Sequence, residues 1–154
     1  MPRRTALIVV VPEAQQHVLI THVPAHVTIL FPFADAGDVD EDALRQLFAR
    51  FRPFDFELDR IERFADAGTV WLHPEPSAPF GDLTQAVWER WPEHPPYGGL
   101  HETVIPHVTV SEEPVEVDVP LPISSRADEV TLIEEVEPGR WTARSRFALG
   151  QGVA

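Results

Sequence analysis

The chain has 154 residues, of which 25 are acidic and 12 are basic, and its formal net charge is −13. A protein that grips long nucleic acid needs basic surface to displace the counterions of the phosphates, so we expect no broad nucleic-acid footprint. A small anionic ligand, or one nucleotide end held in a local pocket, is compatible with this charge.

The sequence contains no cysteine, which excludes disulfide bonds, thiolate zinc sites and a cysteine nucleophile. The longest apolar run, Ala6 to Val11, ends at Pro12 and is far shorter than the roughly 18 residues that a membrane span needs. No secretion-signal core follows Arg3 and Arg4. Hydrophobic residues make up 44% of the chain and charged residues 24%. We therefore predict a globular, cytoplasmic protein without a membrane segment.

The first third of the chain predicts two strands and a helix. Thr5 to Val11 is apolar on both faces and β-branched, as in a central strand. Ala25 to Phe31 is the next expected strand, placed between Pro24 and Pro32. Asp40 to Phe51 carries one apolar stripe at helical spacing and predicts a helix.

The middle of the chain predicts two strands, a helix and a linker. Phe54 to Phe64 alternates as a strand does, and its phase slips near Arg60, which indicates a bulge. The further expected elements are a strand at Thr69 to His73, a helix at Ser77 to Trp91 and a linker at Pro92 to Gly99.

The last third predicts a strand at Val104 to Val110, a proline-rich stretch that ends at Ser125, and a β-hairpin. The hairpin strands are Asp128 to Val136 and Arg140 to Leu149, joined by a turn around Pro138-Gly139.

Two short segments of the sequence are near copies of each other. Pro-Ala-His26-Val-Thr28-Ile and Ile-Pro-His107-Val-Thr109-Val each place a His-x-Thr motif in an expected strand. Internal duplication explains such a repeat and predicts two pseudo-symmetric lobes. We expect one bilobal domain, 1–154, with motif-bearing halves at roughly 1–95 and 96–154.

The His-x-Thr motif suits acid–base chemistry on a phosphate. Strand side chains alternate between faces, so His26 and Thr28 point one way, as do His107 and Thr109. Two imidazoles facing one cleft provide an acid and a base near neutral pH without a metal. The hydroxyls can donate to phosphate oxygens and hold the phosphoryl group in line. We therefore predict a phosphodiester-cleaving site.

The paired motifs and the order of elements around them resemble the two-histidine (2H) phosphoesterase superfamily, and within it the 2′-5′ RNA ligase-like and RNA 2′,3′-cyclic phosphodiesterase family. The resemblance runs from Val11-Pro12-Glu13 through PAHVTILFPF and PHVTV to EEVEPGRWTARSRFALG. It implies an α+β fold with two antiparallel sheets lining a central cleft and helices outside. It also implies hydrolysis of a 2′,3′-cyclic phosphate on a nucleotide or RNA end, without a cofactor, by a catalytic set that matches His26, Thr28, His107 and Thr109.

The chain departs from this family in two places. Relatives carry a long helix between the first strand and the first motif, whereas only the segment from Glu13 to Val23 fills that gap here. A helix also usually follows the second motif, but Pro114, Pro120 and Pro122 disfavour one at that place. We expect these changes to affect substrate specificity more than the motifs themselves.

Three further residues are candidates for substrate binding. Trp71 shares a strand face with Thr69 and His73, where it could stack on a base, and core packing is the alternative. Arg144 and Arg146 lie in a row of basic side chains on the last strand and are candidate phosphate contacts, with a solvated edge as the alternative.

Histidines near the first motif permit a different hypothesis. His17, His22 and His26, together with the later residues His101 and His107, could form a metal site. However, Pro24 interrupts any helix that would align them, and no carboxylate follows at ligand spacing. We therefore predict no metal. A metal-dependent hydrolase and a non-catalytic binder of nucleotide-like ligands are kept as alternatives, and the sequence indicates no oligomeric state.

Overall fold

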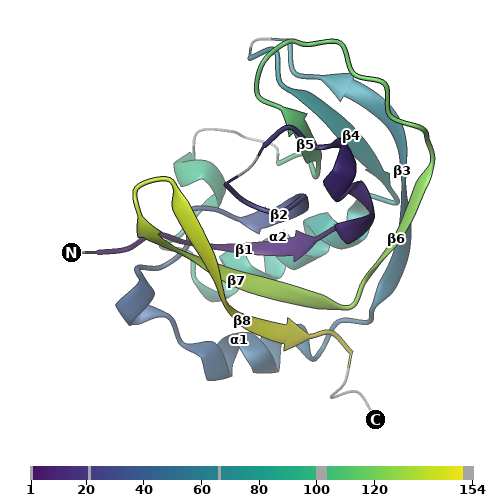
Figure 1. The fold of residues 1–154 in the computed structure, drawn as a ribbon. Helices are drawn as coiled ribbons and strands as arrows, with labels where there is room; N and C mark the ends of the chain where they lie inside the picture. The colour runs from purple at the N-terminus through teal and green to yellow at the C-terminus, as the bar shows by residue number, and fades with distance from the viewer. Residues whose placement is uncertain (1, 21, 66, 100–103, 151–154) are drawn as a thin grey trace.

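The computed structural model describes residues 2–20, 22–65, 67–99 and 104–150 of the protein. Within these residues, eight strands form one antiparallel sheet (Figure 1). The strands are β1 (Thr5–Val10), β2 (His26–Leu30), β3 (Phe54–Arg63), β4 (Val70–Glu75), β5 (Val108–Ser111), β6 (Ile123–Ala127), β7 (Glu129–Glu137) and β8 (Arg140–Ala148). Their order across the sheet is β6-β3-β4-β5-β2-β1-β7-β8.

The sheet is curled and consists of two halves, each of which contains one motif. β1, β2, β7 and β8 form one half, and β3 to β6 form the other, so the two halves of the sequence are interleaved in space. The halves join where β2 pairs with β5 at Val27 and Val108. The expected α+β class is confirmed, and the two expected sheets are continuous because the two motif strands pair directly.

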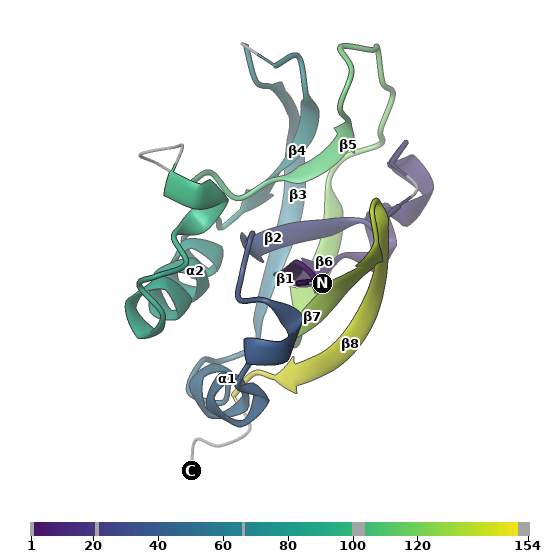
Figure 2. The same cartoon turned by 90° about the vertical axis from the view of Figure 1, so that its left-hand side faces the viewer.

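Two helices cover one face of the sheet (Figure 2). They are α1 (Glu41–Phe48) and α2 (Ala78–Arg90), which confirm the two predicted helices with shorter ends. The side chain of Asp40 accepts a hydrogen bond from the backbone N–H of Ala43 at 3.0 Å and caps α1, as its residue type favours. None of the helices in the described part of the chain is long and apolar enough to cross a membrane.

The main hydrophobic core lies between the helices and the sheet. Every other residue of the central strands contributes to it, including Val27 and Val108 beside the two motif histidines. From the helices, Phe48 of α1 and Phe80 of α2 are fully buried against this face. Because strand residues alternate between faces, burial of Val27 and Val108 turns the neighbouring histidines and threonines to the opposite face, away from the helices.

Three short 3-10 helices complete the described elements: η1 (Pro12–His17), η2 (Ala36–Asp38) and η3 (Pro96–Gly99). η1 occupies the gap in which relatives were expected to carry a long helix. The predicted bulge in β3 is confirmed, because its register with β4 shifts between Leu58 and Arg60. β6 was not predicted. It pairs with β3 directly after the proline-rich stretch and is an edge strand of the sheet. Nearby prolines are tolerated at such an edge, because fewer backbone N–H groups are needed for strand pairing there.

Candidate active site

The pairing of β2 with β5 brings the two His-x-Thr motifs side by side. Val27 is opposite Val108, so continuing this antiparallel register by one residue places His26 opposite Thr109 and Thr28 opposite His107. Residues directly opposite each other in an antiparallel pair have Cβ atoms about 4.5–5.5 Å apart. Each histidine therefore faces the threonine of the other motif, and all four side chains lie on the sheet face away from the helices.

Backbone hydrogen bonds fix the two imidazoles in the same way. His26 Nδ1 lies 2.6 Å from the carbonyl oxygen of Pro24, and His107 Nδ1 lies 2.7 Å from that of Ile105. A carbonyl only accepts hydrogen bonds, so Nδ1 carries the proton and donates in both cases. Each Nε2 is then left to accept a proton from a ligand, or to donate one when the ring is protonated.

Burial affects the protonation of both motif histidines. Desolvation lowers the pKa of His26 most, the backbone carbonyl of Pro24 opposes this, and the nearby His107 lowers it further. Burial likewise lowers the pKa of His107, against the effect of its own carbonyl partner. Both rings are therefore mainly neutral at pH 7, the form in which Nε2 accepts a proton.

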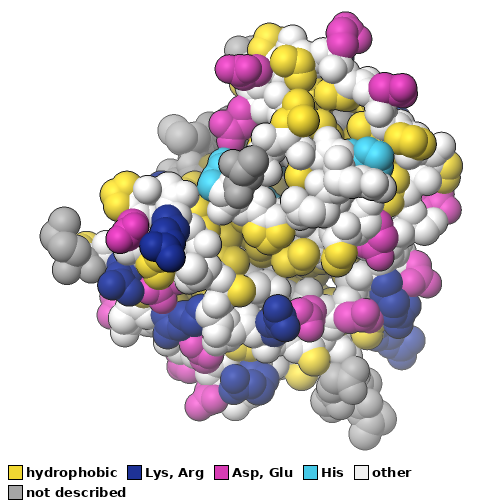
Figure 3. Space-filling view, in the orientation of Figure 1, with side chains coloured by type: hydrophobic (Ala, Val, Ile, Leu, Met, Phe, Trp, Pro, Cys, Tyr) yellow, Lys and Arg dark blue, Asp and Glu magenta, His cyan; other side chains and the backbone are white. Residues whose placement is uncertain are grey.

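A pocket of about 280 Å³, which we call the motif pocket, lies over this part of the sheet. Its described lining includes His26, Thr28 and Thr109. His107 is not part of this lining, and its ring is edge-on to Phe64 at 5.1 Å and to Trp71 at 5.8 Å between centroids. Figure 3 shows apolar side chains across the middle of this face, with charged side chains around them.

Sequence reasoning missed Arg4, Phe31 and Trp141 of the motif pocket, and it indicated only a solvated charge near the anion site for Glu112, which also lines this pocket. Arg4 donates to Glu135 from Nε at 2.7 Å and from a terminal nitrogen at 2.9 Å. Its guanidinium also lies over the rings of Phe31 and Trp141, 5.3 and 5.8 Å from their centroids. Phe31 and Glu112 directly follow the two motif strands, whereas Arg4 and Trp141 come from distant parts of the chain that no local pattern in the sequence relates.

Tyr97 is a further residue of the site that the sequence did not indicate. Its hydroxyl is hydrogen-bonded to the hydroxyl of Thr28, and burial raises its pKa. Its backbone has a φ of 52°, and its N–H donates to the carbonyl of Phe31 at 2.6 Å. A non-glycine residue with positive φ is uncommon. This backbone conformation carries the phenol to Thr28 from within the segment predicted as a linker.

Trp71 lies on the motif face, as predicted, opposite Thr109. It is only 6% exposed, and its ring stacks on Phe64 with the centroids 4.9 Å apart. Its indole N–H is buried and has no hydrogen-bond partner among the described residues. Trp71 is therefore packed against its neighbours on the motif face, and base stacking stays a prediction.

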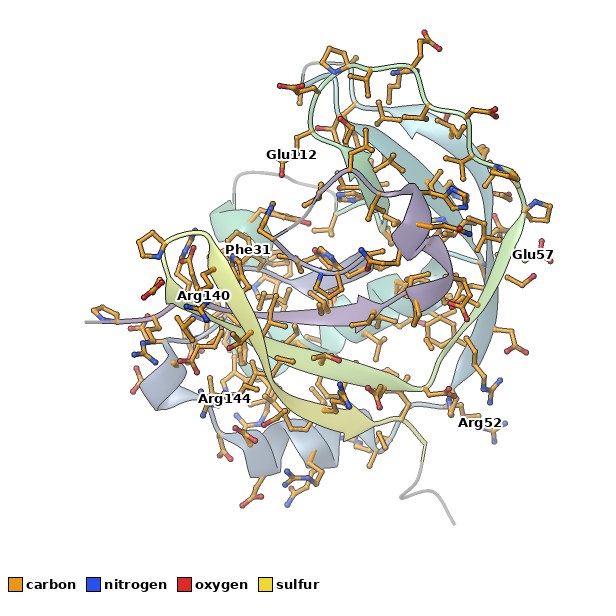
Figure 4. All side chains as sticks on the ribbon, viewed as in Figure 1. Phe31, Arg52, Glu57, Glu112, Arg140 and Arg144 are labelled. Atoms are coloured by element: carbon orange, nitrogen blue, oxygen red, sulfur yellow. The ribbon has the colours of Figure 1, made fainter. Side chains whose placement is uncertain are left out.

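The structure does not bring Arg144 to the motifs. β7 and β8 shift register opposite Arg144, which becomes the extra residue of a bulge. Its guanidinium binds Glu41 at 2.9 Å and the carbonyl of Ala36 at 2.7 Å, beside α1 (Figure 4). The bulge divides the predicted row of arginines, so a phosphate contact by Arg144 is not supported by its position.

Arg146 lies on the other side of this bulge. It lines a larger pocket of about 590 Å³ that adjoins the motif pocket and shares Ile8, Val23, Ile133 and Trp141 with it. Its Nε is 3.5 Å from a carboxylate oxygen of Glu129. A substrate contact by Arg146 stays a prediction.

One group of possible metal ligands occurs in the described residues, and neither motif histidine belongs to it. Asp59, His73 and Glu75 offer ligand atoms within 4.8 Å of one another, and His73 Nδ1 lies 2.8 Å from Asp59. Of the histidines in the metal hypothesis, His22 lines the motif pocket, and His101 lies outside the described residues.

A curled α+β sheet in which β2 and β5 bring two His-x-Thr motifs together is the arrangement that the resemblance to two-histidine phosphoesterases implied. The family model described as the 2′-5′ RNA ligase superfamily matches residues 6–146. The chain belongs to this superfamily, and the resemblance predicted from the motifs is confirmed. Membership supports a phosphoesterase-type activity.

Solved structures of the same fold extend along nearly the whole chain. E. coli LigT complexed with 3′-AMP matches with a TM-score of 0.71 and 21% identity, covering 98% of this chain and 100% of that one. E. coli LigT in apo form matches with a TM-score of 0.72 and 20% identity, covering 97% of this chain and 99% of that one. The protein TT0787 of Thermus thermophilus matches with a TM-score of 0.61 and 20% identity, covering 97% of this chain and 100% of that one. No curated protein matches the chain.

Proposed function

We propose that the protein hydrolyses a 2′,3′-cyclic phosphate on a nucleotide or an RNA end, with His26 and His107 as its general acid and base. The observation that carries this proposal is the pairing of Val27 in β2 with Val108 in β5, a register that, continued by one residue, sets each imidazole opposite the other motif's threonine. Both rings are fixed through Nδ1, which leaves Nε2 for the reaction. An acid–base pair and two hydroxyl donors are what cleavage of a phosphodiester requires.

The reaction needs one neutral and one protonated histidine. Nε2 of the neutral ring takes a proton from water as the water oxygen bonds to phosphorus. The bond from phosphorus to one ribose oxygen then breaks, and this oxygen takes the proton from Nε2 of the protonated ring. Thr28 and Thr109 donate hydrogen bonds to the non-bridging phosphate oxygens. Because the two motifs are arranged alike, either histidine can serve as the base.

Small substrates suit this site better than long RNA. The net charge of −13 opposes binding of a polyanion, and the motif pocket of about 280 Å³ is near the lower limit for small-ligand sites. E. coli LigT has been solved with 3′-AMP, with ATP and with NADP+, which supports a nucleotide-sized ligand for this chain as well.

Turnover should survive the removal of metal ions. The proposed chemistry uses imidazoles and hydroxyls, and the group of possible ligands at Asp59, His73 and Glu75 does not include the motif histidines. We expect a panel of 2′,3′-cyclic nucleotides to be hydrolysed equally well before and after treatment with a chelator. Loss of turnover that zinc or manganese restores would favour the metal-dependent alternative, and binding without turnover would favour the non-catalytic one.

The pH dependence of kcat/KM should show an optimum below pH 6.5. This parameter reports ionisation of the free enzyme, and burial lowers the pKa of both motif histidines below the ordinary value of about 6.5. The active form has one ring protonated, so it declines once the pH exceeds both pKa values. We expect kcat/KM to fall by about tenfold per pH unit on the alkaline side. A rate that is flat or rising from pH 6.5 to 8 would contradict this assignment.

A further inference from the structure

The motif pocket contains a carboxylate that the proposed reaction does not use. Glu112 follows β5 directly and lines the pocket together with His26, Thr28 and Thr109. In Figure 4 it comes from the half of the sheet that contains β5, whereas Phe31, another lining residue, comes from the half that contains β2. An acidic side chain facing a phosphate site needs an explanation, because it repels the ligand.

The charge of Glu112 is not compensated within the described structure. No described residue forms an ion pair or a hydrogen bond with its carboxylate. With histidines counted as neutral, the one other charged side chain of the described pocket lining is Arg4. Arg4 is already bound to Glu135 by two hydrogen bonds, which, together with the backbone N–H of Gly139, lower the pKa of that carboxyl to about 2. A phosphate entering the pocket therefore meets one paired cation and one unpaired anion.

The substrate and the product of the proposed reaction differ in charge. A 2′,3′-cyclic phosphate is a diester with a single negative charge. Ring opening by water yields a phosphate monoester, which carries a charge between about −1.5 and −2 at pH 7. Coulomb repulsion is proportional to the charge, so Glu112 repels the product up to about twice as strongly as the substrate.

We propose that Glu112 is a specificity-determining residue that makes the motif pocket select singly charged phosphodiesters over doubly charged phosphate monoesters. This inference rests on the proposed function and adds the class of phosphate that the pocket accepts. Glu112 thereby limits product inhibition and excludes the phosphate monoesters that are abundant among nucleotides. The selection is achieved at some cost in affinity for the substrate, since the cyclic phosphate is repelled as well.

The test compares Glu112→Gln with Glu113→Gln. Both substitutions remove one negative charge from adjacent, exposed residues, so the change in net charge is the same. Only Glu112 lines the motif pocket. The probe is adenosine 3′-monophosphate, whose Kd is measured by calorimetry, and the substrate is adenosine 2′,3′-cyclic phosphate, for which kcat/KM is measured.

We expect Glu112→Gln to tighten binding of adenosine 3′-monophosphate by about three- to tenfold, and Glu113→Gln to change it by less than about twofold. kcat/KM for the cyclic nucleotide should rise by less than the affinity for the monoester does. In 1 M salt the Debye length is about 3 Å, so the difference between the two variants should nearly disappear.

Equal Kd values for the two variants would overturn the inference, and so would a Glu112→Gln protein that does not bind the monoester measurably more tightly than the wild type. The proposed function can fail separately. If the wild-type protein does not hydrolyse any cyclic nucleotide, that proposal is wrong, while the calorimetric comparison still decides whether Glu112 rejects monoesters.

Discussion

Replacing either His26 or His107 by alanine should lower kcat/KM for a 2′,3′-cyclic nucleotide by about 10²–10⁴, the effect of losing a general acid or base. Each ring is fixed by one hydrogen bond from Nδ1 to a local carbonyl, which leaves Nε2 available for proton transfer. Alanine removes the proton-transfer group and leaves the strand pairing at Val27 and Val108 in place. The measurement is steady-state kinetics on the purified variants.

The double variant separates a catalytic pair from two independent binding residues. If one histidine is the acid and the other is the base of the same step, the second substitution has little left to remove, so the effects should combine to far less than their product. Two contacts that only bind substrate would instead give nearly multiplicative losses. His17→Ala is the matched control, because it removes a histidine of the metal hypothesis that does not line the motif pocket. Near wild-type activity in either single variant would refute the two-histidine mechanism.

The sequence predicted the site best where the chemistry depended on local periodicity. Alternation along a strand was sufficient to put His26 with Thr28, and His107 with Thr109, on one face. The repeat of the motif also indicated that two such strands face one cleft. The repeat did not predict the register between β2 and β5, because the pairing of Val27 with Val108 joins residues far apart in the chain.

The parts that the sequence did not predict depend on backbone irregularities and on long-range contacts. The bulge at Arg144 reverses the faces of β8, so that a row of arginines that looked continuous in the sequence is divided. Tyr97 reaches Thr28 only through a positive φ in a segment rich in proline and glycine. Arg4 and Trp141 meet because β7 and β8 return to pair beside β1. The periodicity of the sequence indicates none of these arrangements.

Thr28→Val and Thr109→Val should each lower the rate of hydrolysis, which is the second large effect that we expect. Valine keeps the shape and the strand propensity of threonine and removes the donor. Losing one preorganised donor to a developing phosphate charge costs up to about 10²–10³ in rate, and the open pocket should give the lower end of this range. Activity is measured on a 2′,3′-cyclic nucleotide, and stability is measured by urea unfolding of the same samples.

The two threonines should differ in stability, because their surroundings differ. Thr28 is hydrogen-bonded to Tyr97, so valine removes one hydrogen bond between the two side chains, which costs on the order of 1 kcal/mol. Thr109 has no such partner among the described residues, and Thr109→Val should unfold at nearly the wild-type urea concentration. Tyr97→Phe is the matched control: because the two hydroxyls bind each other, its stability loss and that of Thr28→Val should combine to less than their sum in the double variant, whose rate should stay low. If both valine variants unfold rather than lose activity, the hydroxyls are structural. If neither variant loses activity, the phosphate does not bind between the two motifs.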